Sequence, residues 1–209
     1  MTQVLTRFNL YVKRLIWNWQ HKHVVQQHRA RFKGKVPTIL SCNCTGGVLY
    51  HDLGLPFTSP TINLYMRFPD FLRFCENLEY YLTLRITPYQ GDIKRDYPLG
   101  MLGDLILYLV HYSSVEEADQ KWQTRKQRMD LENIFVIATD RDGFSPEYLP
   151  RFNALPYRKK IFTHIPVDSP DCVCLPGEDD HQVRGLMEPT AGGHRVIDAF
   201  DWVEWFNIG

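Results

Sequence analysis

The residues best suited to chemistry lie at positions 41–47, with the sequence SCNCTGG. An apolar run precedes them, so we expect them to follow a buried strand and to open a helix. At the carboxyl end of such a strand, the backbone N–H groups of Gly46 and Gly47, with Asn43 beside them, could bind a phosphate. Cys44 would have a lowered thiol pKa there and could act as a nucleophile. The alternative is a buried structural cysteine beside a tight strand-to-helix turn.

A carboxylate and a histidine flank the next apolar segment. Asp104 begins the run that continues to residue 110, and His111 stands at its far end. A buried carboxylate needs a partner. Arg125 falls on the apolar side of a helix that Ser114 is expected to cap, so we expect a buried Arg125 paired with Asp104 or with a bound anion. We assign Cys44, Asp104 and His111 as candidate catalytic residues.

Two further carboxylates follow a third apolar strand, at residues 134–139. Asp140 and Asp142 are separated by one residue, Arg141, and are followed by Gly143. Two carboxylates at this spacing can hold a divalent ion on the phosphates of a nucleotide sugar, and Arg141 could contact the same phosphates. The alternative is a structural turn, of which Asp-Gly is typical.

The elements that would position these groups alternate along the chain. We expect strands at 36–43, 62–66, 105–111, 134–139, 161–164 and 172–175, and helices at about 69–81 and 114–129. Residues 176–195 are expected to form a long loop, and residues 197–206 a short docking helix. Strands separated by helices predict a single α/β domain over 36–209, with a mixed, mostly parallel sheet flanked by helices.

Residues 1–35 form a separate basic segment. They hold eight Lys or Arg and no acidic residue, in a chain of zero net charge. Phe8, Tyr11, Leu15 and Trp19 follow the spacing of one helical face. An amphipathic helix of this kind either packs on the acidic body or a second subunit, or lies on an anionic membrane. We expect burial of this face in the fold.

Composition excludes several classes of protein. The chain has 209 residues with 44% hydrophobic and 23% charged residues, which is typical of a folded globular protein and not of a disordered one. Five cysteines and the lack of a signal-peptide pattern favour a reducing cytoplasm, with the inner face of the membrane as an option for residues 1–35. The absence of a basic, aromatic-rich patch beyond residue 35 argues against nucleic-acid binding.

A set of short motifs between residues 37 and 162 resembles a bacterial domain of unknown function that is often labelled an exopolysaccharide biosynthesis protein. The resemblance includes the segment Asn43 to Gly47, Leu53-Gly54-Leu55-Pro56, Tyr97-Pro98-Leu99-Gly100, Leu102-Gly103-Asp104, His111-Tyr112, Trp122 with Arg125, and Asp140-Arg141-Asp142-Gly143. It implies a small α/β protein that acts in capsule or exopolysaccharide synthesis, and it implies no particular reaction.

These observations lead to two hypotheses of different classes. The first is a transferase that moves a glycosyl, acyl or phosphoryl group onto or from a sugar nucleotide or phosphosugar, with a divalent metal as an optional cofactor. The second is a non-catalytic scaffold that joins other components of polysaccharide assembly. A pocket that gathers Cys44, Asp104, Arg125 and Asp140 would favour the enzyme. Scattering of these groups, with exposed apolar faces on the terminal helices, would favour the scaffold.

Overall fold

A four-stranded parallel sheet forms the centre of the protein in a computed structural model, which describes residues 2–175 and 181–208, with side chains from residue 10 onward. The strand order is β1-β5-β6-β7, and every neighbouring pair is parallel. The strands are β1 (Thr38–Ser41), β5 (Ile134–Thr139), β6 (Arg158–Thr163) and β7 (Cys172–Cys174). All six residues of β5 are buried, as expected for a strand covered on both faces.

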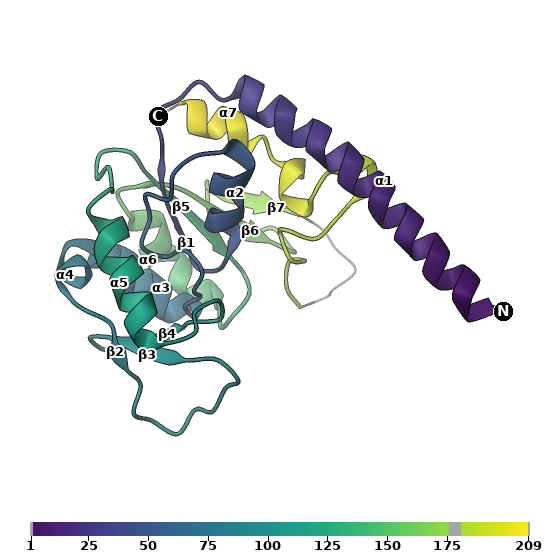
Figure 1. Ribbon diagram of the computed structural model, residues 1–209. Helices are drawn as coiled ribbons and strands as arrows, with labels where there is room; N and C mark the ends of the chain where they lie inside the picture. Colours follow the sequence, from purple (N-terminus) through teal and green to yellow (C-terminus); the bar gives the residue numbers. More distant parts are fainter. Residues whose placement is uncertain (1, 176–180, 209) are drawn as a thin grey trace.

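Helices cover both faces of this sheet (Figure 1). On one face lie α2 (Thr45–Leu53) and α7 (Trp202–Asn207), which pack on Ile39, Phe135 and Phe162. On the other lie α3 (Phe68–Glu76), α4 (Leu78–Thr83), α5 (Val115–Lys126) and α6 (Leu149–Ala154). Three short 3₁₀ helices, η1 (Pro146–Tyr148), η2 (Ala191–Gly193) and η3 (Val196–Ala199), occur in the connections. The α/β class expected from the sequence is confirmed.

The antiparallel strands form a second, separate sheet. It has the order β2-β3-β4 and consists of β2 (Thr87–Pro88), β3 (Leu99–Leu102) and β4 (Leu105–Tyr108). Gly103, with a φ of 63°, and Asp104 connect β3 to β4 in a two-residue turn. The strand expected to reach His111 therefore ends at Tyr108, and it belongs to a hairpin that packs beside α3.

Two expected elements differ from the structure. Residues 61–63 form a turn, and only Tyr65 makes an isolated bridge, to Tyr108, where we expected a strand. The helix expected over 69–81 is divided into α3 and α4, because Asn77 leaves the helical region with a φ of −123°. Ser114 caps α5 as expected, since its hydroxyl accepts the backbone N–H of Glu117 at 3.1 Å.

The first helix, α1 (Thr2–Arg31), runs along the C-terminal part of the chain and then projects beyond the body (Figure 1). Its contact begins at Trp17, whose indole N–H donates to the Thr190 carbonyl at 2.8 Å. No helix among residues 2–175 and 181–208 is both long and apolar enough to cross a bilayer. The loop expected at 176–195 lies partly outside the described residues, and from 181 onward it is irregular apart from η2.

Candidate functional site

The carboxyl ends of the parallel strands bring several polar side chains to one edge of the sheet. Asn43 and Cys44 follow β1, Asp140 follows β5, and His164 follows β6. Because neighbouring strands lie about 4.8 Å apart, the ends of β1 and β6 are separated by roughly 10 Å. This edge is the candidate site.

At the end of β5, a buried carboxylate holds a histidine. Asp140 Oδ2 accepts the backbone N–H of His164 at 2.7 Å and the ring Nδ1–H of the same residue at 2.5 Å. Asp140 Oδ1 accepts the backbone N–H of Val183 at 2.7 Å. The carboxylate thus fixes the imidazole and directs its proton to Nδ1, which leaves Nε2 as the basic nitrogen. Asp140 is a site residue that the sequence indicated, whereas His164 is one that it missed.

The turn between β1 and α2 uses its own side chains to cap the helix. Asn43 Oδ1 accepts the backbone N–H of Thr45 at 3.0 Å, and Ser41 Oγ accepts that of Gly46 at 3.1 Å. The expectation that Gly46 offers its N–H to an anion is therefore wrong, because that N–H is already bonded. A Cβ at Gly46 would lie 2.8 Å from Ser41 Oγ, so this glycine serves close packing.

A pocket of about 350 Å³ opens beside this turn. The residues that line it are Cys44, Gly47, Val48, His51, Asn63 and His111. Burial raises the pKa of the Cys44 thiol, so the lowered pKa expected at the helix start is wrong and the thiol is protonated at neutral pH. The structure does bring Cys44 and His111 together, and it adds His51, which lies seven residues after Cys44 on α2.

A second, larger pocket of about 600 Å³ lies beyond β7. Leu175, which directly follows β7, is part of its wall, together with Arg184, His194 and Arg195. Arg184 pairs with Glu188 at 2.9 Å, and Arg195 pairs with Asp52 at 2.5 Å. In strand order, the Asp140–His164 pair lies between the two pockets.

Arg125 is buried as expected, but its partners are neutral. Its guanidinium donates to the Tyr112 hydroxyl at 2.7 Å and to the Ile62 carbonyl at 3.2 Å, and it lies over the Phe57 ring. Pairing with Asp104 is wrong. Arg125 instead ties α5 to the loop between α2 and α3, which contains Phe57 and Ile62.

Asp104 lies away from the pockets, on the exposed turn between β3 and β4. It pairs with Arg73 of α3 and accepts the Tyr81 hydroxyl at 2.9 Å. The expected burial of Asp104 is therefore wrong: the glycine before it makes a hairpin turn, and the turn points the carboxylate to solvent. His111, beyond the other end of β4, is separated from it by the length of the strand.

Asp142 and Arg141 complete the turn after β5. Arg141 donates to the Val183 carbonyl at 2.7 Å, and Asp142 is an exposed residue with a left-handed φ of 56°. The two carboxylates that we expected to share a metal thus face different surroundings, since Asp140 is buried. Among the described residues, no group of three or more His, Cys, Asp or Glu side chains could hold a metal ion. A metal at Asp140 and Asp142 stays a prediction.

Comparison with known proteins supports the resemblance to a bacterial domain of unknown function, but it does not support the exopolysaccharide label. A protein of Haemophilus influenzae, described only as uncharacterized, is 41% identical over 174 residues, which are 81% of this chain and 84% of the relative. A family model described as a domain of unknown function, DUF1919, matches residues 16–207. Neither description names a process or a reaction. Because the match covers the sheet, both pockets and the packed part of α1, the chain belongs to the DUF1919 family.

Proposed function

We propose that the carboxyl edge of the sheet is the active site of a transferase, with His164 as its general base. The observation that carries this proposal is the hydrogen bond of 2.5 Å between His164 Nδ1 and the buried Asp140 carboxylate. A carboxylate that holds Nδ1–H orients the ring and stabilises the imidazolium that forms when Nε2 takes a proton. Enzymes that activate a hydroxyl nucleophile use this arrangement.

The proposed reaction uses an acceptor hydroxyl bound at Nε2 of His164. The histidine takes the hydroxyl proton, the oxygen attacks the group to be transferred, and the bond to the leaving group breaks. A sugar hydroxyl as acceptor and an activated or phosphorylated sugar as donor fit the motif resemblance, which implies cell-surface polysaccharide synthesis. The chemistry of the transferred group, glycosyl, acyl or phosphoryl, is open.

The proposal assigns the two substrates to the two pockets, neither of which has Asp140 or His164 in its wall. The pocket of about 600 Å³ has the size of a small-molecule site and is lined by Arg184, His194 and Arg195, which are suited to phosphate oxygens. The pocket of about 350 Å³ presents His51 and His111, with the protonated Cys44 thiol in its wall. In this proposal Cys44 and His111 contact substrate, and His164 performs the proton transfer.

The decisive experiment compares His164→Gln with His23→Gln in a bacterium that lacks its own copy of the gene. His23 is an exposed histidine on α1, so its replacement is the matched control. We expect the wild type and His23→Gln to restore the surface polysaccharide and His164→Gln to fail at equal protein level. With an identified donor, the His164 variant should lose about 10²–10⁴-fold in kcat. Full restoration by His164→Gln would exclude the enzyme.

The scaffold remains the second candidate, because the site groups are scattered and one terminal helix has an exposed apolar face. Tyr11, Leu15 and Trp19 of α1 are exposed, and Asp104, Arg125 and Asp140 all lie outside the two pockets. The C-terminal helix α7 does not share this exposed face, since Trp202, Val203, Trp205 and Phe206 are buried. A scaffold would keep its function in the His164→Gln variant, so the same experiment separates the two classes.

A further inference from the structure

Helix α1 has two different sides. One side packs on the body through Trp17, His21, Val24 and His28, which are spaced by four, three and four residues. His21 Nδ1 donates to the Gly193 carbonyl at 2.7 Å, and the His28 ring packs edge-on against Trp202 with centroids 4.7 Å apart. This side of α1 is therefore already covered by the body of the protein.

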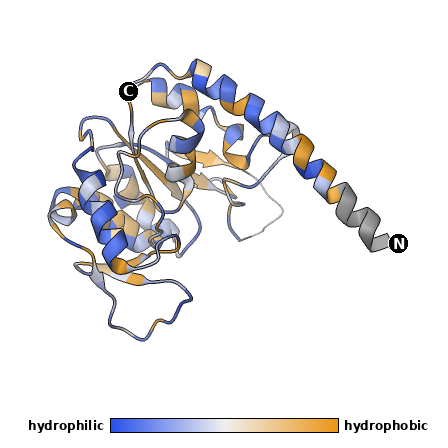
Figure 2. Cartoon of the chain, viewed as in Figure 1, coloured by the Kyte–Doolittle hydropathy of each residue, from blue (hydrophilic) through white to orange (hydrophobic). Residues whose placement is uncertain are grey.

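The opposite side carries large apolar residues that touch little of the protein. Tyr11 is 60% exposed, Leu15 is 49% exposed, Ile16 is 52% exposed and Trp19 is 73% exposed. Their spacing of three and four residues puts them on one face. Figure 2 shows hydrophobic residues in the part of α1 that extends beyond the body. The expected burial of Tyr11, Leu15 and Trp19 in this chain's own fold is therefore wrong, and Phe8 lies outside the described side chains.

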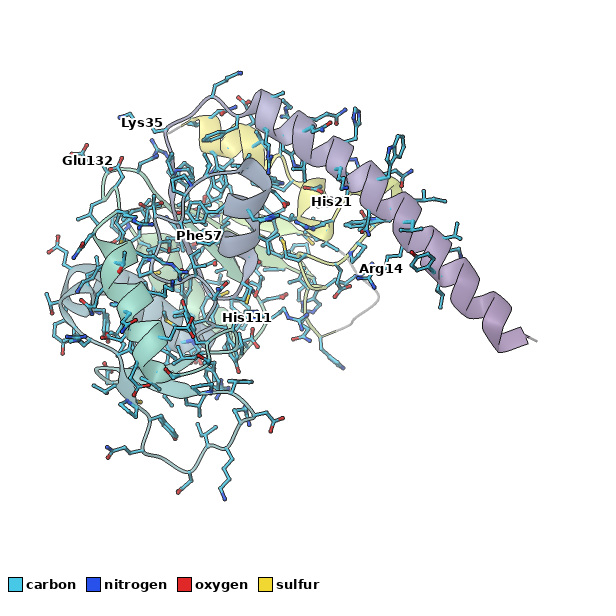
Figure 3. All side chains as sticks on the ribbon, viewed as in Figure 1. Arg14, His21, Lys35, Phe57, His111 and Glu132 are labelled. Carbon is cyan, nitrogen blue, oxygen red and sulfur yellow. The ribbon has the colours of Figure 1, made fainter. Side chains whose placement is uncertain are left out.

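Basic residues accompany this apolar face. Lys13, Arg14 and Lys22 are exposed, and none of the described acidic residues forms an ion pair with them. In Figure 3, Arg14 lies on the projecting part of the helix, whereas His21 lies where α1 meets the C-terminal segment. Residues 1–35 contain no acidic side chain. A second copy docked helix to helix would bring positive charges together, whereas anionic lipid headgroups would attract them.

We propose that the projecting half of α1 is a membrane-surface anchor that lies in the headgroup region of a bilayer containing anionic lipids. Leu15 and Ile16 would enter the acyl boundary, and the rings of Tyr11 and Trp19 would sit at the interface, where aromatic residues with a polar atom are favoured. The helix would lie along the surface and not span it. This anchor is independent of His164, so either proposal can fail alone.

The test measures co-sedimentation of the full chain with vesicles of phosphatidylcholine, with and without phosphatidylglycerol. Leu15→Gln with Trp19→Gln removes apolar area from the anchor. Tyr80→Gln with Leu131→Gln removes similar side chains from exposed positions elsewhere, 57% and 55% exposed. All four side chains are exposed, so both double variants should keep the wild-type unfolding temperature.

We expect the wild type and the Tyr80/Leu131 variant to bind the mixed vesicles and the Leu15/Trp19 variant to bind about 100-fold more weakly. Lys13→Gln with Lys22→Gln should reduce binding to mixed vesicles about tenfold and leave binding to phosphatidylcholine unchanged. Three results would overturn the anchor: no wild-type binding, equal loss in the Tyr80/Leu131 variant, or self-association in sedimentation that the Leu15/Trp19 variant abolishes.

Discussion

Asp140 and His164 lie 24 positions apart in sequence, and no spacing rule connects them. Asp140 was identifiable because two carboxylates follow an apolar strand, whereas His164 was expected to be the last residue of its strand. The signal that could have found it is the position: His164 directly follows the strand next to β5, and the ends of parallel strands meet at one edge. Arg125 shows the converse case, because helical spacing predicted its burial but could not identify the neutral Tyr112 as its partner.

His28 gives a pH-dependent prediction at the scale of one residue. Burial lowers its pKa below the ordinary value of 6.5, and the carboxylates of Asp198 and Asp52 oppose this only in part. The unfolded chain therefore binds a proton at a higher pH than the folded chain does. The stability that comes from neutral His28 is present above pH 6.5 and is lost as the pH falls through the folded pKa.

Replacement of His28 by Phe should weaken this pH dependence. Phe keeps a ring against Trp202 and removes Nδ1, a buried atom with no hydrogen-bond partner among the described residues. Urea denaturation between about pH 5 and 7 would measure the slope. The exposed His23→Gln variant should retain the wild-type slope. An unchanged slope in His28→Phe would show that other groups cause the acid sensitivity.

At the scale of elements, the docking of α1 illustrates what periodicity can and cannot predict. The spacing of apolar residues predicted a helix, and it selected the face of Tyr11, Leu15 and Trp19 as the inner one. The packed face instead depends on Trp17 and His21, which donate to backbone carbonyls of the C-terminal segment. Side-chain hydropathy carries no information about hydrogen bonds to backbone carbonyls more than about 170 residues away in the sequence. The periodicity therefore predicted the wrong face as the packed one.

Gly193 provides the test of this contact. Its φ is 82°, and a Cβ there would lie 2.4 Å from the His21 backbone nitrogen. Gly192 also has a left-handed φ, of 67°, but its Cβ would meet no described atom closer than 3.6 Å. Gly193→Ala should lower the free energy of unfolding by about 2–4 kcal/mol, whereas Gly192→Ala should cost only about 1 kcal/mol. Urea denaturation measures both, and equal losses would contradict the close approach.

At the scale of the whole molecule, one sheet separates two apolar clusters. Residues that alternate along β5, such as Phe135 and Val136, belong to opposite clusters. The sequence predicted the sheet well, because runs such as 134–138 are apolar throughout and are bounded by polar residues. The sequence predicted the second sheet poorly. Strand β2 has only two residues, and the pattern around Gly103 is compatible both with a turn and with the start of a longer strand.

Because the two clusters share one sheet, we predict that they unfold together. Phe206, fully buried against Phe135 with ring centroids 5.0 Å apart, belongs to one cluster only. Phe206→Ala should lower the free energy of unfolding by about 3–5 kcal/mol, and Ile208→Ala, at an exposed position, by less than about 0.5 kcal/mol. Tryptophan fluorescence and far-ultraviolet circular dichroism should give one coincident transition. Two separate transitions in the Phe206 variant would contradict this.

The contacts of α1 also set an order of events during synthesis on the ribosome. The helix is made before Thr190, Gly193 and Asn207, the residues that bind it. At about 5–20 residues per second, α1 emerges on the order of ten seconds before these partners exist. Throughout that interval both sides of the helix are uncovered, and the nascent chain presents more apolar surface to chaperones and lipids than the finished protein does.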